Sequence, residues 1–319
     1  MILAVDGGGT KTFSAIIDEN NLRVVGIGVA GPSNVRSVSK STSKGNIIRS
    51  INRAKRMARC NDIKKSIYGI AGYGDSAYHT DEVNSIVKSI NKDAVITNDG
   101  EAAVNLVTLG SDGIVAAVGT GSVGSYINNG RMHRIGGWSY LTDDAASGFW
   151  IARRALEMCE KSYDGLIEKT VLIKKFEDYF KMPLREVVAN LEKHFDKRLM
   201  ASLAIIVDES SSQNDEVSMH ILKSAFGEIK LMLDGMRKNF HRDVTMGVLG
   251  GVMQSKLIRT YLKEEFNDIK IFYGYHAAIG NAIKLLNIRE ESIRDELIRD
   301  VDNMLVHLSQ VEKDLLFIK

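Results

Sequence analysis

The chain has 319 residues, of which 44% are apolar and 26% are charged, and its formal net charge is +2. This composition excludes wholesale disorder and is sufficient for two folded cores of roughly 100–200 residues each. The near balance of charge gives no reason to expect nucleic acid as a partner, and no apolar run reaches the ~20 residues that a membrane-spanning helix needs.

The first third of the chain alternates short apolar runs with turn residues. The runs at 2–5, 12–17 and 24–29 are separated by glycine- and asparagine-rich turns, which predicts three strands in an antiparallel meander. Apolar residues at helical spacing then predict a helix over 47–58. The expected elements that follow are a strand at 66–71, a helix at 81–90 and a strand at 94–97. This β-β-β-α-β-α-β order predicts an α/β layer fold with mixed strand directions.

The same order begins again in the second third of the chain. Apolar runs at 113–118, 124–127 and 131–135 repeat the plan of strand, glycine turn, strand, turn and strand. We interpret this pattern as an internal structural repeat.

Two similar domains follow from the repeat, with the first at residues 1–109 and the second at 110–319. The second domain is expected to contain helical inserts near 145–161 and 217–240. It then returns to a strand at 245–249 and ends in helices.

The glycine turn after the first strand has the composition of an anion site. Three glycines at positions 7–9 let backbone N–H groups approach an anion closely, and Thr10 adds a hydroxyl. Asp6 at the strand end is suited to hold Mg²⁺ through water, and Lys11 can reach a phosphate or remain solvated. The pattern is not a Walker A loop. This stretch alone leaves open a phosphate site and an ordinary hairpin.

Two further glycine turns favour the phosphate site. The turn 119–122 occupies the equivalent place in the second domain, so two hairpins are expected to hold one polyphosphate from opposite sides. A third turn, with Gly250 and Gly251, follows a late strand and leads toward Ser255 at an expected helix start. Its glycines would let an adenine ring pack against the backbone.

Five motifs in chain order resemble one family. The motifs DGGGTKT, TNDGEAA, AAVGTGS, GGWSYLTDDAASGFWIARRAL and LGGVMQS span 6–255 and resemble the BadF/BadG/BcrA/BcrD-type ATPases. Within that family they are most similar to the N-acetylglucosamine kinase branch of the actin/sugar-kinase/heat-shock ATPase superfamily. The resemblance implies two ribonuclease-H-like domains with ATP and Mg²⁺ in the cleft between them. The nucleotide residues expected from the turns and the resemblance are Gly8, Gly9, Thr10, Lys11, Thr120, Gly121, Gly250, Gly251 and Ser255.

The catalytic residue that the resemblance implies is Asp99. A carboxylate at a strand end can accept the proton of an attacking sugar hydroxyl. Without the resemblance, the favoured interpretation of Asn98-Asp99-Gly100 would be turn chemistry that caps the following helix.

The resemblance places sugar contacts at Asn34 and Asp144, and close backbone approach makes Gly72 a further candidate. For Asp144 the alternative is the N-cap of the following helix. The sequence departs from the family pattern beside Asp144, because Ala145 stands where glutamate is usual and Asp143 where glycine is usual. One sugar contact is therefore expected to be missing or relocated.

The expected function is an ATP-dependent kinase of a small sugar, N-acetylglucosamine or a related hexose, in a cytoplasmic protein that the resemblance suggests is a homodimer. The alternative acceptor is 2-keto-3-deoxygluconate or another sugar acid. A rival is the activator ATPase of 2-hydroxyacyl-CoA dehydratases, whose iron–sulfur cluster is held by cysteines of the second domain. Here Cys60 lies in the first domain and Cys159 in the second. A second rival is a non-catalytic sugar sensor, although no helix-turn-helix region is attached.

Overall fold

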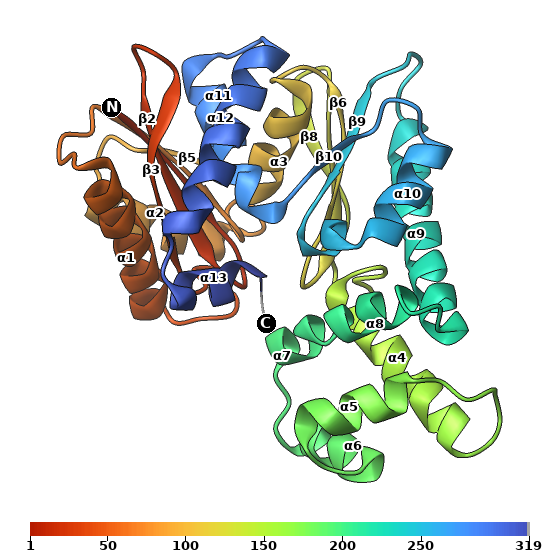
Figure 1. The fold of residues 1–319 in the computed structure, drawn as a ribbon. Coiled ribbons are helices and arrows are strands. Elements are labelled where there is room, and N and C mark those ends of the chain that lie inside the picture. Colours follow the sequence, from red (N-terminus) through yellow and green to blue (C-terminus); the bar gives the residue numbers. More distant parts are fainter. Residues whose placement is uncertain (318–319) are drawn as a thin grey trace.

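Two five-stranded sheets with the same topology form the frame of the protein in a computed structural model, which describes residues 1–317 (Figure 1). The strand order is β3-β2-β1-β4-β5 in the first sheet and β10-β9-β6-β7-β8 in the second. The strands are β1 (Ile2–Gly7), β2 (Thr12–Asp18), β3 (Arg23–Ala30), β4 (Lys65–Ile70), β5 (Val95–Thr97), β6 (Gly113–Val118), β7 (Ser122–Asn128), β8 (Arg131–Gly136), β9 (Thr245–Leu249) and β10 (Lys270–Phe272). The internal repeat predicted from the sequence is visible as this shared order.

The strand directions follow from the connections. In each sheet the first three strands are antiparallel and are joined by short turns, whereas the fourth and fifth run parallel to the first after helical crossovers. The first strand of each sheet is almost wholly buried, as its uninterrupted apolar run requires. Because the glycine turns follow equivalent strands, the repeat places them at equivalent ends of the two sheets.

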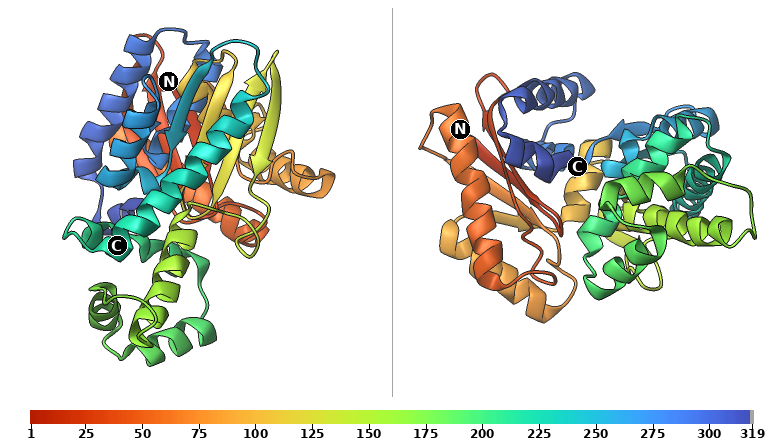
Figure 2. Two further views of the ribbon diagram at one scale, coloured as in Figure 1. Left: turned by 90° about the vertical axis from the view of Figure 1, so that its right-hand side faces the viewer. Right: turned by 60° about the horizontal axis from the view of Figure 1, so that its bottom comes forward.

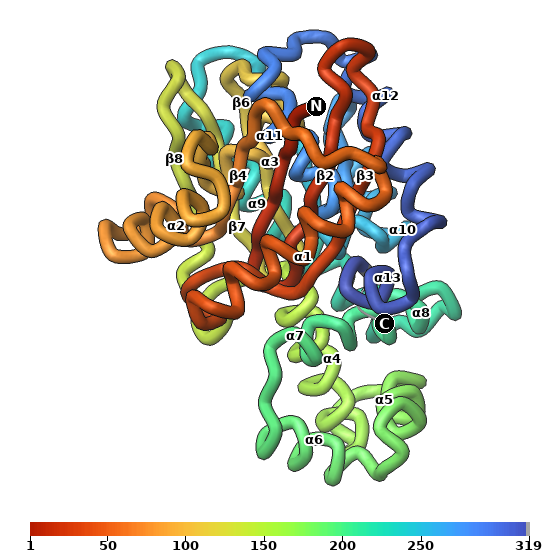
Figure 3. The backbone as a smooth tube through the Cα atoms, turned by 90° about the vertical axis from the view of Figure 1, so that its left-hand side faces the viewer, coloured from red at the N-terminus to blue at the C-terminus, as the bar shows by residue number. Residues whose placement is uncertain are grey.

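Helices cover both faces of each sheet. The helices are α1 (Lys40–Ala58), α2 (Ala77–Ile90), α3 (Asp99–Thr108), α4 (Gly148–Tyr163), α5 (Leu172–Phe180), α6 (Leu184–Lys193), α7 (Lys197–Ser202), α8 (Ala204–Ser211), α9 (Glu216–Arg237), α10 (Lys256–Glu265), α11 (Ala277–Leu286), α12 (Glu291–Met304) and α13 (Gln310–Phe317). Three short 3₁₀ helices are η1 (Gly251–Gln254), η2 (Gly274–His276) and η3 (Leu305–His307). Helices α1 and α2 lie on the outer side of the first sheet (Figure 3).

Helices α3 and α11 lie between the two sheets and pack against each other (Figure 1). Although α11, α12 and α13 come late in the chain, α11 contacts β1, and α12 and α13 contact β3. One core cluster accordingly joins Ala4 and Phe13 of the first sheet with Ile279 of α11 and Leu297 of α12. The chain therefore returns to the first sheet after α10. The division at residues 109 and 110 stays a prediction.

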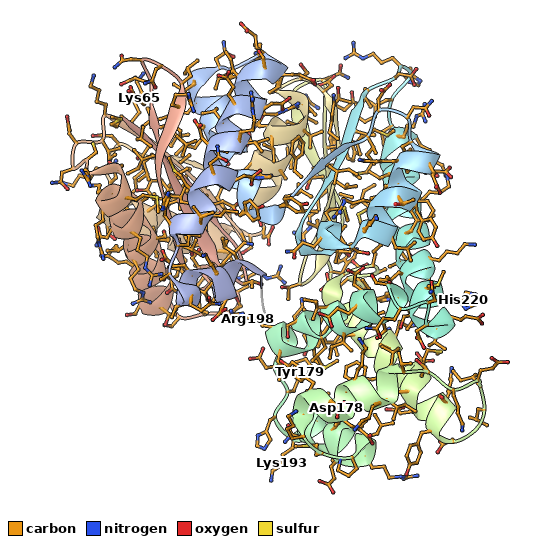
Figure 4. The ribbon with its side chains drawn as sticks, viewed as in Figure 1. Lys65, Asp178, Tyr179, Lys193, Arg198 and His220 are labelled. Atoms are coloured by element: carbon orange, nitrogen blue, oxygen red, sulfur yellow. The ribbon has the colours of Figure 1, made fainter. Side chains whose placement is uncertain are left out.

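Helices α4 to α8 form a group that extends beyond one end of the second sheet, on the side where α13 ends (Figures 1 and 2). Helices α5 and α6 are the outermost of this group. Asp178 and Tyr179, at the end of α5, lie far from Lys65 of the first sheet (Figure 4). The expected inserts near 145–161 and 217–240 correspond to α4 and α9. Among residues 1–317, no helix has the length and apolar character needed to span a membrane.

The expectation that the chain ends in helices after 245–249 was incomplete, because the short strand β10 lies between α10 and α11. It pairs in parallel with β9 over three residues at the edge of the sheet. A strand of three residues gives too little alternation to be recognised in the sequence.

Candidate active site

Three glycine-rich turns, after β1, β6 and β9, line one cavity of about 440 Å³. The predicted nucleotide residues on its wall are Gly8, Gly9, Thr10, Lys11, Thr120, Gly250, Gly251 and Ser255. The predicted metal residue Asp6 also lines it, and Gly121 is the next residue after Thr120. This volume falls within the ~300–1,000 Å³ of small-molecule sites. The structure thus brings the three turns together around one space.

The first two turns meet directly. The hydroxyl oxygens of Thr10 and Thr120 are 2.8 Å apart and share a hydrogen bond. Each turn is closed by its own backbone bond, from Gly8 N–H to the Lys11 carbonyl (2.9 Å) and from Gly119 N–H to the Gly121 carbonyl (2.8 Å). Two matching hairpins therefore face each other, which is a suitable arrangement for an anion held from two sides.

The far side of the cavity is more apolar. It is formed by Ile151, Ile205, Leu222, Val252 and Ile258, from α4, α8, α9, η1 and α10. The carboxylates of Asp208 and Glu209 on α8 also line the cavity. An apolar wall with a few polar groups suits a ring with hydroxyl substituents.

Gly250 has φ +131°, and a Cβ atom there would lie 2.0 Å from the Val118 carbonyl oxygen. The close approach of the third turn to the second therefore requires glycine. Ser255 caps α10, since its hydroxyl accepts a hydrogen bond from Ile258 N–H (3.3 Å). The helix start expected near 253–255 is thus a 3₁₀ turn followed by α10.

Asp6, at the end of β1, is buried, and its surroundings disfavour the ionised form of its carboxyl group. Burial, and then the charge of Asp99, raises the pKa of Asp6 to about 8, with Lys11 opposing the rise. Burial also lowers the pKa of Lys11 to about 8, against the charge of Asp6. The Lys11 ammonium lies 5.9 Å from the ring centre of Tyr275 and donates to the Leu316 carbonyl of α13 (3.5 Å).

Asp6 lines the cavity, and the charge of Asp99 disfavours its ionised form, so a bound hard cation would offset that repulsion. A carboxylate in this position fits a cation held through water, and the assignment of Mg²⁺ to Asp6 stays a prediction. Within residues 1–317, no cluster of three or more histidine, cysteine or carboxylate side chains provides an alternative metal site.

Asp99 is the first residue of α3 and lies just after β5. The helix is capped by its neighbour, because the Asn98 side chain accepts a hydrogen bond from Gly100 N–H (2.8 Å). Capping therefore belongs to Asn98. Burial raises the pKa of Asp99 to about 6, with Asp75 adding to the rise and Gly100 N–H and the charge of Arg134 opposing it. A half-buried carboxylate with this pKa is mostly ionised at pH 7 and remains a usable proton acceptor.

Asn34 and Gly72 lie side by side next to the first turn. Asn34 N–H donates to the Gly8 carbonyl (3.1 Å), and a Cβ atom at Gly72 would lie 3.4 Å from the Asn34 side-chain oxygen. The same oxygen accepts a hydrogen bond from Arg36 N–H (2.9 Å). These two predicted sugar residues are therefore adjacent, on the side of the turn shared with the loop after β4.

Asp144 is buried, with φ +56°, and faces the second turn. Its carboxylate accepts hydrogen bonds from Ser122 N–H (3.1 Å) and from the ammonium of Lys197 (2.8 Å). A Cβ atom at Gly121 would lie 2.8 Å from this carboxylate, so the close approach requires glycine. The N-cap of α4 is Ser147. Asp144 thus holds the turn, and its contact with a sugar stays a prediction.

Three charged residues near the predicted site residues had not been predicted from the sequence: Asp75 and Arg134, whose charges act on Asp99, and Lys197, which pairs with Asp144. Asp75, in the loop after β4, accepts from Arg36 (3.2 Å) and from Arg134 of β8 (3.0 Å). Asp75 directly follows the 71–74 glycine loop, so its position was a usable signal. No sequence signal indicated Arg134, because the residues around it depend on how the two sheets are placed. Lys197 was missed for the same reason.

Comparison with known proteins places the chain among nucleotide-dependent enzymes. The N-acetylmuramic acid/N-acetylglucosamine kinase of Clostridium acetobutylicum is 29% identical over 281 residues, covering 83% of this chain and 88% of the relative. The N-acetyl-D-glucosamine kinase of Dictyostelium discoideum is 24% identical over 295 residues, covering 83% and 92%. A crystal structure of a candidate N-acetylglucosamine kinase from Chromobacterium violaceum has a TM-score of 0.73 at 20% identity, covering 89% and 98%.

The likeness to that crystal structure confirms the predicted fold class. The model of the BadF/BadG/BcrA/BcrD ATPase family matches residues 3–284, which is most of the chain. The resemblance drawn from the five motifs is thereby confirmed, and the chain belongs to the BadF/BadG/BcrA/BcrD ATPase family.

Proposed function

We propose that this protein is an ATP-dependent kinase that phosphorylates a hydroxyl of a small amino sugar, with N-acetylglucosamine as the first candidate. The observation that carries the proposal is the meeting of Thr10 and Thr120 between two glycine turns, with Asp6 on the same cavity wall. Relatives named as kinases of N-acetylated amino sugars support a sugar acceptor.

The chemistry follows from the positions of the charged groups. The acceptor hydroxyl oxygen forms a bond to the γ-phosphorus of ATP, the bond from that phosphorus to the β,γ-bridging oxygen breaks, and ADP leaves. Asp99 accepts the hydroxyl proton. The N–H groups of the two turns and Lys11 stabilise the charge on the polyphosphate. Mg²⁺, which Asp6 would hold through water, supplies further neutralisation of that charge.

Asn34, Gly72 and Asp99 are the residues to which we assign the acceptor. Asp99 influences the pKa of Asp6, so the acceptor side and the polyphosphate side are electrostatically connected. Asp144 acts first on the second turn, through Ser122 N–H, and its contact with the sugar remains part of the proposal. The cytoplasmic location and the homodimer expected from the sequence also remain parts of it.

The cysteines argue against the activator ATPase. Cys159 is fully buried in α4, and burial raises the pKa of its thiol to about 12. A buried thiol of this kind is a poor ligand for a cluster shared between subunits. Cys60 lies in the loop between α1 and β4, which belong to the first sheet and its outer layer.

The test is a coupled ADP-release assay with Mg²⁺-ATP over N-acetylglucosamine, glucose, glucosamine and 2-keto-3-deoxygluconate. We expect turnover that depends on one acceptor and that is lost in Asp99→Asn, which should still bind ATP. ATP hydrolysis that ignores every acceptor would contradict the proposal and favour a coupled ATPase. Undiminished turnover in Asp99→Asn would remove Asp99 from the mechanism.

A further inference from the structure

A cluster of three charged side chains bridges the two sheets close to Asp99. We name it the Arg36–Asp75–Arg134 cluster. Arg36 Nη1 lies 3.2 Å from one carboxylate oxygen of Asp75, and Arg134 Nη1 lies 3.0 Å from the other. Arg36 follows β3 and Asp75 follows β4 in the first sheet, whereas Arg134 belongs to β8 of the second. A single carboxylate is therefore held by two guanidinium groups from opposite sheets.

The Arg134 guanidinium is fixed by its own strand end. Its Nε donates to the Gly136 carbonyl (3.1 Å), and its Nη2 donates to the Gly137 carbonyl. Both glycines have positive φ, which turns their carbonyls toward the arginine. These bonds leave Nη1 for Asp75. The guanidinium is thus held by two backbone carbonyls in addition to Asp75, which orients it for a carboxylate.

The cluster adjoins the residues assigned to the acceptor. Arg36 N–H donates to the Asn34 side chain (2.9 Å), and a Cβ atom at Gly72 would lie 3.9 Å from Arg36 Cγ. The Asn98 side chain donates to the Tyr73 carbonyl (2.6 Å), which holds the loop of Asp75 against the start of α3. The charges of Asp75 and Arg134 both act on Asp99. The cluster therefore lies beside Asn34 and Gly72 and within electrostatic range of Asp99.

We propose that Arg36 and Arg134 bind a carboxylate group of the acceptor, and that Asp75 holds their place when no such group is present. This inference rests on the proposed kinase function and specifies its substrate class as an acidic sugar. The cluster carries two positive charges and one negative charge, and an acceptor carboxylate that took the place of Asp75 would keep the same balance between the two arginines. The side chains of Arg36 and Arg134 are 46% and 43% exposed, so a ligand can reach both. An acceptor carboxylate would replace Asp75 in the same two hydrogen-bonding positions.

The test compares acceptors that differ in charge at one place. N-acetylmuramic acid carries a lactyl carboxylate that N-acetylglucosamine lacks, and its methyl ester keeps the bulk without the charge. We expect the wild-type protein to prefer the acid over its ester. Arg36→Gln and Arg134→Gln should each lower the ratio of kcat/KM for the acid to that for the ester by roughly 10- to 100-fold. Asp75→Asn should raise this ratio, because it removes the competing carboxylate.

Arg131→Gln is the matched control, since Arg131 is an exposed arginine at the start of the same strand, and it should leave the ratio unchanged. Calorimetry of acid and ester binding to Asp99→Asn, with and without Arg134→Gln, gives a readout independent of turnover. Melting temperatures confirm that each variant is folded.

Three outcomes would overturn the inference. Equal losses for acid and ester in the arginine variants would assign the cluster to holding the two sheets together, with the kinase function intact. A wild-type protein that phosphorylates N-acetylglucosamine but has equal kcat/KM for the acid and its ester would likewise overturn the inference and leave the kinase function intact. Failure of the wild type on every sugar would remove the proposed function itself, and the inference with it.

Discussion

The hydroxyl groups of Thr10 and Thr120 lie 2.8 Å apart although 110 positions separate them in the chain. Each belongs to the turn between the first two strands of its sheet, so the contact joins equivalent points of the internal repeat. The two sheets therefore meet through matching turns at the cavity. A change in the spacing of the sheets would alter this contact first, and the contact is thus a direct probe of the site.

Removing either threonine hydroxyl should weaken ATP binding. We expect Thr10→Ala and Thr120→Ala each to raise the KM for ATP by roughly fivefold, which corresponds to the loss of about 1 kcal/mol of one hydrogen bond. The double variant should lose less ATP-binding free energy than the two single variants lose in sum, because the two hydroxyls share one hydrogen bond. Steady-state kinetics with varied ATP measures this. Thr42→Ala, at an exposed position on α1, serves as the control, and strictly additive losses would contradict the shared bond.

Neutralising Asp99 should stabilise the fold while it abolishes turnover. The folded pKa of about 6 lies above the ordinary aspartate value of 3.8, so the folded state holds its proton more tightly than the unfolded state. The free energy of unfolding therefore falls as the pH rises from 3.8 to about 6, and this loss of stability persists at higher pH. At pH 7.5, Asp99→Asn should raise the free energy of unfolding by about 1–2 kcal/mol, after allowance for partial exposure.

Denaturant unfolding of the two proteins at about pH 7.5 and about pH 4 checks this, because the difference should disappear at the lower pH. The kcat of Asp99→Asn should fall by about 10²–10⁴-fold. A variant less stable than the wild type at both pH values would contradict the assigned protonation.

The acidic limb of the pH–rate profile should report Asp99. Because its pKa is raised to about 6, kcat/KM for the acceptor, measured at saturating Mg²⁺-ATP so that Asp6 is already ionised, should be level above that value and fall tenfold per pH unit below it. Rates from about pH 5 to pH 8 at saturating Mg²⁺ give the profile, and the apparent value belongs to the coupled pair of Asp6 and Asp99. Arg134→Gln should move the limb to higher pH, since Arg134 lowers the pKa of Asp99. A limb that moves to lower pH would exclude this assignment.

Binding of Mg²⁺-ATP should release protons. Asp6, with a pKa of about 8, is mostly protonated at pH 7, and a carboxylate must be ionised to hold a cation through water. We expect release of up to about one proton per nucleotide, measured by calorimetry at pH 7 in buffers of different ionisation enthalpy. Asp6→Asn should reduce this release. Equal proton release in the two proteins would place its origin elsewhere.

The ion pair of Lys197 and Asp144 should stabilise both the fold and the second turn. Lys197→Met leaves a buried carboxylate with only its backbone donor at Ser122, and should cost about 1–3 kcal/mol. The melting temperature should fall, and the KM for ATP should rise because Asp144 supports the turn. Lys193→Met is the matched control, since Lys193 lies at the end of α6, far from the cavity (Figure 4). Adding Asp144→Asn should restore part of the lost stability.

The local parts of the fold could be predicted from the sequence. Apolar runs between turn residues predicted the strands β1 to β8 near their observed positions. The strand β9 was predicted at its observed bounds. Glycine spacing located all three turns that line the cavity. These features depend on residues near one another in the chain, where periodicity and turn chemistry operate.

The long-range parts could not be predicted. Nothing in the residues of α11 and α12 shows that they pack on the first sheet, because any apolar helix face could cover either sheet. The pairing of Asp75 with Arg134 likewise depends on how two separate sheets are placed. Asp144 was expected near the sugar, and its bond to Lys197 became visible only with α7 in position. Sequence patterns identify the turns, whereas the partners across the site come from tertiary packing.

The return of α11 and α12 to the first sheet has a consequence for synthesis on the ribosome. The core around Ala4 and Phe13 is completed by Ile279 and Leu297, which are made more than 260 residues later. Until then the inner face of the first sheet is an exposed apolar surface in the nascent chain, open to misassembly or to a chaperone. The first half is therefore expected to wait for the last helices, so that the nucleotide cavity forms only when nearly the whole chain has emerged.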